Sequence, residues 1–119
     1  MAININAETL KKLADEVGAD TVAILLNVFS DELEQYCQKL SSQPSINQIG
    51  DISHAIKSSA ASFGADDLAL MAQECEYRVR QGQDDWMIDH LPQFRQMVAG
   101  MAIEYKQLAG SNESINRMF

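Results

Sequence analysis

The chain has 119 residues, of which 46% are hydrophobic and 22% charged, and its net charge is −8 at pH 7. This length is enough for one domain with a modest core. We therefore expect a single domain over residues 1–119, with a folded bundle over about 7–109 and a polar tail over about 110–119. Because an acidic surface repels phosphate backbones and anionic lipids, we expect neither nucleic acid nor membrane as a partner.

The two cysteines, Cys37 and Cys75, lie far apart and have no second ligand at metal-binding spacing. Each lies among apolar residues, so both are predicted to be free, buried thiols. The first residues lack the pattern of a signal peptide, and no apolar run is long enough to span a bilayer. We expect a cytoplasmic protein.

Apolar residues recur at spacings of three and four, which predicts helices throughout the chain. Asn6 is the expected N-cap of a short first helix that ends at Gly18. Asp20 is the expected cap of a longer second helix. This helix ends in the stretch "SSQPS", where Pro44 marks a turn.

A third helix is predicted from about Ser45 to Phe63, closed by Gly64, and a fourth from about Asp66 to Gly82. The segment "DDWMIDHLP" is predicted to be interrupted or restarted at Pro92, before a last helix. No segment shows the period of two that is typical of strands. The pattern predicts an all-α fold, an antiparallel up-down four-helix bundle with a short additional N-terminal helix as a lid.

The stretch "SHAIKSSAASFGADDL", residues 53–68, places a histidine in the third helix. On an ideal helix the apolar positions form one stripe and His54 lies almost opposite it. The stripe consists of Ile49, Ile52, Ile56, Ala60 and Phe63. An exposed histidine is therefore expected, not a core histidine.

Small residues surround this histidine on its own face: Gly50, Ser58 and Ala61. Lys57, three positions after His54, could neutralise an anion carried by the ring. An ordinary imidazole, with a pKa of about 6.5, is a good nucleophile at neutral pH. Without a general base or a phosphate loop beside it, it can still accept a phosphoryl group from a partner that supplies metal and charge.

His54, Lys57, Ser58 and Ser59, followed by "FGA" at 63–65 and Leu68, resemble the histidine-containing phosphotransfer (HPt) domain. The resemblance covers nearly the whole chain. It implies that His54 is phosphorylated and that Lys57 offsets the phosphoryl charge. Many members have glycine where this chain has Ser58. A polar residue of the following helix often orients the histidine, and both Gln73 and Glu76 are candidates here.

The resemblance also implies the partners. His54 would accept a phosphoryl group from the receiver aspartate of a hybrid sensor kinase and pass it to the receiver aspartate of a response regulator, in a quorum-sensing-type relay. The chain itself would need no cofactor, because Mg²⁺ would belong to the receivers, and it would have no kinase activity of its own. A monomer is the default for the predicted architecture, although the sequence does not determine the oligomeric state. The expected partner-binding residues are Gly50, Asp51, Ser58, Ala61 and Gly64, the last also permitting a tight passage into the next helix.

Three other interpretations of the sequence are open. A histidine-kinase dimerisation domain would carry an acid beside the histidine, where this chain has Ala55. An enzyme or metal site using His54 with His90 would need further ligands, for which Asp85 and Asp89 are nominal candidates. A helical adaptor would dock on a signalling partner without chemistry and would tolerate replacement of His54.

Overall fold

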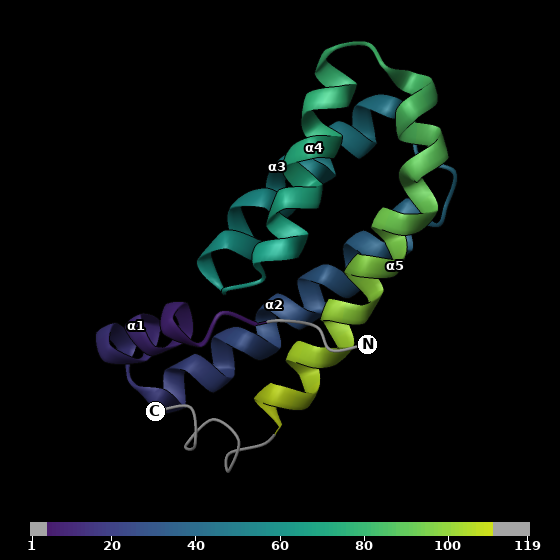
Figure 1. Ribbon diagram of the computed structural model, residues 1–119. Coiled ribbons are helices and arrows are strands. Elements are labelled where there is room, and N and C mark those ends of the chain that lie inside the picture. The colour runs from purple at the N-terminus through teal and green to yellow at the C-terminus, as the bar shows by residue number, and fades with distance from the viewer. Residues whose placement is uncertain (1–4, 111–119) are drawn as a thin grey trace.

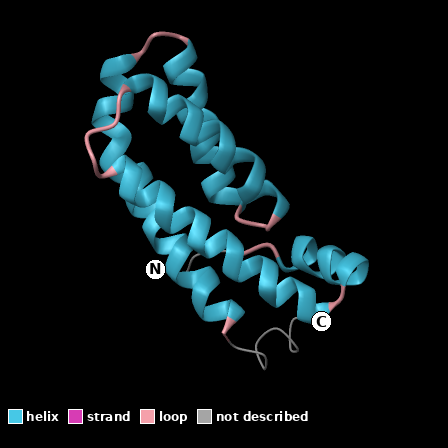
Figure 2. Cartoon of the chain, turned by 180° about the vertical axis from the view of Figure 1, so that it is seen from behind, coloured by secondary structure: helices cyan, strands magenta, loops and turns pink. Residues whose placement is uncertain are grey.

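The computed structural model describes residues 5–110, and within them it contains helices only. These are α1 (Ala7–Val17), α2 (Ala19–Leu40), α3 (Ile46–Ser62), α4 (Asp66–Arg80) and α5 (Asp84–Ala109). α2 packs chiefly on α5 and α3 chiefly on α4, while α1 lies beside the first turns of α2 (Figures 1 and 2). The all-α prediction and the antiparallel four-helix arrangement are confirmed. The predicted tail lies almost wholly outside the described residues.

Local signals set most helix ends. The Asn6 side chain accepts a hydrogen bond from the Thr9 amide at 3.2 Å, and Ser45 forms a reciprocal capping box with Gln48. The prediction for Asp20 was wrong. α2 begins at Ala19, directly after Gly18, so Asp20 lies in the first turn, where its charge still favours the helix N-terminus.

The expected interruption at Pro92 was also wrong, because α5 runs through this residue without a break. A proline in a helix interior removes one backbone hydrogen bond and favours a kink. Here Met87 and Phe94, on either side of Pro92, are both fully buried in the core. Their burial holds both halves of the segment in one helix.

One apolar core joins the helices. Phe29 of α2 stacks on Phe63 at a centroid distance of 4.7 Å and meets Tyr105 edge-on at 4.9 Å. Cys75 is a free thiol within this core, and burial, followed by the nearby Glu74 charge, raises its pKa to about 12. Cys37 is also free but only half-buried. The predicted thiols are therefore unpaired, with Cys75 the more deeply buried.

The turn between α3 and α4 is held from two sides. Gly64 has φ +79°, and its carbonyl accepts a hydrogen bond from the Asn6 amide at 2.8 Å. The Asn6 side chain also donates to Asp66 at 2.9 Å. From the opposite side, the buried Tyr105 hydroxyl donates to the Phe63 carbonyl at 2.6 Å.

None of the helices in the described part of the chain is long and apolar enough to cross a membrane.

This turn generates a prediction with an internal control. Gly64 and Gly82 both have positive φ, +79° and +71°, but an added Cβ would lie 2.8 Å from the Asn6 carbonyl oxygen at Gly64 and would meet nothing within 4 Å at Gly82. We expect Gly82→Ala to lower the free energy of unfolding by about 1 kcal/mol through backbone strain alone. Gly64→Ala should cost distinctly more, because the N-terminal segment must also move. Urea unfolding of both variants measures the difference, and equal losses would contradict it.

Candidate functional site

His54 lies on α3, on the side facing away from the core, and its side chain is 60% exposed. Its neighbours Ile52 and Ile56 point inward and are buried. The exposure expected from the helical pattern is confirmed. The ring thus stands at the surface, supported by the packed α3–α4 pair.

A carboxylate from the next helix fixes the orientation of the ring. Glu76 of α4 lies 2.5 Å from Nδ1 of His54, through its Oε2. Its other oxygen, Oε1, accepts a hydrogen bond from Nζ of Lys57 at 2.6 Å, and Arg80 donates to Oε2 at 3.2 Å. Gln73, the other candidate for this role, is exposed and has no hydrogen bond to His54. Glu76 therefore orients the histidine.

Glu76 is buried, with only 7% of its side chain exposed, yet its pKa lies below the ordinary value, which favours the ionised form. The hydrogen bond from Lys57 makes the largest contribution and lowers the pKa of Glu76. Burial raises this pKa, whereas the His54 hydrogen bond and the Arg80 charge lower it further. An ionised carboxylate can only accept hydrogen bonds. The proton between the two residues therefore belongs to Nδ1 of His54. This tautomer leaves the lone pair on Nε2, which has no partner among residues 5–110.

Arg80 is a member of the site that the sequence interpretation did not name. It follows Glu76 by one helical turn, and its side chain is 68% exposed, whereas that of Lys57 is 35% exposed. The i to i+4 spacing of Glu76 and Arg80 on a predicted helix could have suggested the ion pair. Two cations thus pair with the carboxylate that contacts the imidazole.

An open hollow lies beside His54, lined by Asn47, Gly50, Asp51, Glu76, Val79 and Arg80. Asp51 is exposed, as are Ser58 and Ala61 farther along the same helix. Gly50 has a more definite role than access. A Cβ at this position would lie 2.9 Å from Cγ1 of Val79, so the absence of a side chain lets α3 and α4 approach closely.

Gly64, the fifth residue expected to contact a partner, does not belong to this face. It is buried against Asn6, at the end of α3. Its role is the tight turn into α4, which its positive φ makes possible. An added Cβ there would contact the backbone of this chain, not a partner.

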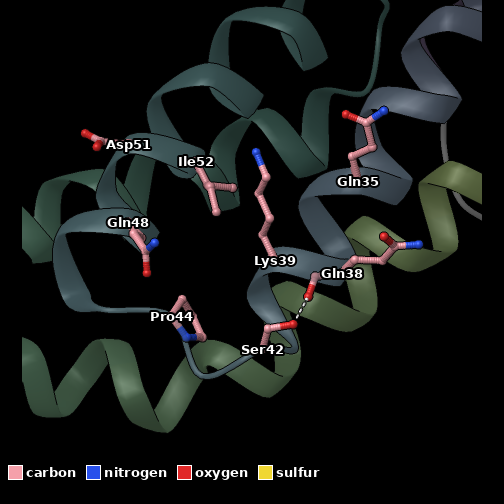
Figure 3. A pocket seen from close by; sticks show the side chains of 8 residues that line it. All are labelled: Gln35, Gln38, Lys39, Ser42, Pro44, Gln48, Asp51 and Ile52. Atoms are coloured by element: carbon pink, nitrogen blue, oxygen red, sulfur yellow. Dashed lines mark hydrogen bonds between the residues drawn. The ribbon is translucent and has the colours of Figure 1, made fainter.

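A second hollow lies between the end of α2 and the start of α3 (Figure 3). Lys39 and Gln35 border it on the α2 side, and Asp51 and Ile52 on the α3 side. Because Asp51 lines both hollows, the two form neighbouring parts of one surface that passes beside His54.

The alternative that pairs His54 with His90 finds no support in the geometry. The His90 ring stacks on Trp86 at 3.9 Å, and its Nδ1 lies 2.8 Å from the Trp86 carbonyl oxygen. Over residues 5–110, no group of three or more His, Cys, Asp and Glu side chains is placed to hold a metal ion. Asp85 and Asp89 are therefore not gathered into a metal site with the two histidines.

The sequence matches the Hpt domain family over residues 22–103, and the chain belongs to this family. The matched span includes all of α3 and α4, and hence His54 and the carboxylate that orients it. Hpt denotes histidine-containing phosphotransfer, so membership places the chain among the proteins of phosphorelays.

Its relatives include phosphorelay proteins named LuxU. That of Vibrio cholerae is 45% identical over 82 residues, covering 66% of this chain and 73% of the relative. That of Vibrio vulnificus is 41% identical over 102 residues, covering 77% and 89%, and that of Vibrio harveyi is 37% identical over 82 residues, covering 66% and 72%. No solved structure was found to match the chain.

The lowered pKa of Glu76 predicts a dependence of stability on pH. Because the folded-state pKa lies below the ordinary value of 4.5, the ionised carboxylate stabilises the fold above that pH. This stabilisation is lost as the pH falls through the lowered value. We expect Glu76→Gln to reduce the free energy of unfolding by about 1–3 kcal/mol at pH 7. The gap to the wild type should shrink below pH 4.5.

Urea unfolding at several pH values measures this gap. Glu74→Gln is the matched control, because Glu74 pairs with Arg78 on the same helix and its side chain is 44% exposed. Its loss should stay within about 1 kcal/mol, as for exposed ion pairs in general. A Glu76→Gln loss that does not change between neutral and acidic pH would contradict the prediction.

Proposed function

We propose that this protein relays a phosphoryl group through Nε2 of His54. The group arrives from the receiver aspartate of a hybrid sensor kinase and leaves to the receiver aspartate of a response regulator, in a cytoplasmic, quorum-sensing-type pathway. One observation carries the proposal: an exposed imidazole whose Nδ1 contacts a buried carboxylate, while Nε2 has no hydrogen-bond partner among residues 5–110. The phosphorelay proteins among its relatives support the same role.

The geometry suits attack on a phosphoryl group presented by another protein. The hydrogen bond to Glu76 stops the ring from rotating, which reduces the entropy lost when the reacting atoms align. Lys57 and Arg80 lie on the same carboxylate and can offset the charge of the incoming group. In this proposal the receiver supplies Mg²⁺ and the remaining contacts to the phosphoryl oxygens.

The surface around His54 suits docking of a receiver domain. Gly50 and Ala61 present little side-chain bulk, and Ser58 is small as well as exposed. Asp51 lies where the two hollows meet, so we propose that it contacts the partner at the edge of the docked surface. Small residues at this place let an aspartyl phosphate reach Nε2 in line with its breaking bond.

Transfer from a labelled, phosphorylated receiver domain tests the function. We expect label on the wild type and none on His54→Gln, because only Nε2 of His54 is presented as the nucleophile. The label should be lost in acid and kept in base, as for a phosphohistidine. His90→Gln is the matched control and should be labelled normally, since His90 stacks on Trp86 away from the site.

Either of two results would overturn the proposal: label on His54→Gln, or no transfer to a folded wild type from any receiver of the same organism. The second result, together with unimpaired partner binding by His54→Gln, would establish the adaptor alternative.

Lys57 gives a further expected outcome. Lys57→Gln removes one positive charge beside the ring while leaving a side chain of similar length. We expect transfer from the receiver to slow by about tenfold, corresponding to roughly 1.4 kcal/mol of lost stabilisation in the transition state. Single-turnover kinetics measures the rate. Lys12→Gln, at an exposed position of α1, is the control, and equal rates for the two variants would refute the role of Lys57.

A further inference from the structure

We propose that Glu76 keeps a proton on Nδ1 of His54 through the whole transfer cycle, so that the phosphorylated ring is a cationic imidazolium from which the phosphoryl group leaves readily. Glu76 is then a positioning residue that also sets how long the phosphorylated state lasts. The inference rests on the proposed function, and it concerns what the carboxylate does after the first transfer.

The chemistry balances without any proton entering or leaving. In the first transfer, the Nε2 lone pair forms a bond to phosphorus, and the bond from phosphorus to the donor aspartate oxygen breaks, its electron pair leaving with the carboxylate. The ring keeps its Nδ1–H and becomes positively charged. In the second transfer, an acceptor aspartate oxygen attacks phosphorus and the Nε2–P bond breaks. Its electron pair returns to Nε2, which restores the neutral ring.

The charged form of the ring needs a counter-ion, and Glu76 is built to be one. Its carboxylate lies 2.5 Å from Nδ1 and is 7% exposed, so solvent screens the attraction poorly. An amide oxygen at this position would accept the same hydrogen bond but would carry no charge. A phosphorylated ring beside an amide would give up its Nδ1 proton more readily, and a neutral phosphoimidazole is the poorer phosphoryl donor.

The other charged groups near the ring do not replace this role. Asp51, on the α3 side of the hollow, is exposed and has no hydrogen bond to the ring among the described residues. Lys57 and Arg80 are cations, and both are more exposed than Glu76. They can turn toward phosphoryl oxygens once Nε2 carries the group, because their side chains end near solvent. Glu76 then remains as the anion in contact with the ring.

The test uses the full chain and phosphoramidate, a small phosphoryl donor that needs no receiver domain. Wild type, Glu76→Gln, Glu76→Asp and Glu74→Gln are phosphorylated, and ¹⁵N spectra of the His54 ring are followed from roughly pH 6 to 10, the range around ordinary imidazole titration and above it. Wild type and Glu74→Gln should hold the Nδ1 proton to a pH about one unit higher than Glu76→Gln, as expected for loss of an adjacent opposite charge.

The lifetime of the phosphohistidine gives a second readout. At pH values above the point at which the wild-type ring also loses its proton, Glu76→Gln should dephosphorylate and donate to a receiver about tenfold more slowly than the wild type, because a one-unit shift leaves a tenfold smaller protonated fraction. Glu76→Asp, which retains the charge on a shorter side chain, should recover part of the wild-type behaviour. A purely structural role for Glu76 would not produce this order, because Asp disturbs the packing more than Gln.

The outcomes separate this inference from the proposed function. Loss of the Nδ1 proton at the same pH in the wild type and Glu76→Gln, with normal transfer from receivers, would overturn the inference and leave the function standing. The expected difference in pH, with no transfer from any receiver, would support the inference and overturn the function. Phosphorylation at Nδ1 in place of Nε2 would overturn the inference outright.

Discussion

A single buried negative charge organises the surface of this protein. Within residues 5–110, Glu76 is the one charged side chain that is buried, and burying a charge is unfavourable unless partners compensate it. Three partners do so, His54 and Lys57 from α3 and Arg80 from its own helix. Because the partners come from two helices, the charge fixes how α3 and α4 lie against each other and, at the same time, which nitrogen of His54 is presented.

The rest of the bundle serves to hold these two helices in place. Their connecting turn is tied to the N-terminal segment through Asn6 and to α5 through Tyr105, so it cannot open without breaking contacts on both sides. The long α2–α5 pair provides the core against which α3 and α4 pack. The histidine therefore stands on a rigid platform although it lies at the surface, and rigidity is what phosphoryl transfer between two separate proteins requires of the nucleophile.

Helical periodicity was sufficient to predict the fold class, most helix limits and the exposure of His54, because each depends on residues close in the chain. Periodicity could not decide whether Gln73 or Glu76 orients His54, since the answer depends on how α4 is rotated against α3. The pairing of Arg80 with Glu76 lies within one helix, so its spacing could have indicated it once Glu76 was chosen. Tertiary contacts overrode a local signal at Pro92, where buried residues on both sides keep the helix continuous. At Asp20 the error was local, because α2 already begins at Ala19, directly after Gly18.

The contact between Gly50 and Val79 has an evolutionary consequence. It lies one helical turn from the contact between His54 and Glu76, on the same helix–helix boundary, and a methyl group at position 50 would force the Val79 side chain or the helices to shift. The close spacing of α3 and α4 thus depends on glycine, which has no side chain, at position 50. A lineage that acquired alanine at this position would have to shrink Val79 or accept longer hydrogen bonds at the histidine. Substitutions at positions 50 and 79 should accordingly occur together, although neither residue takes part in the chemistry at His54.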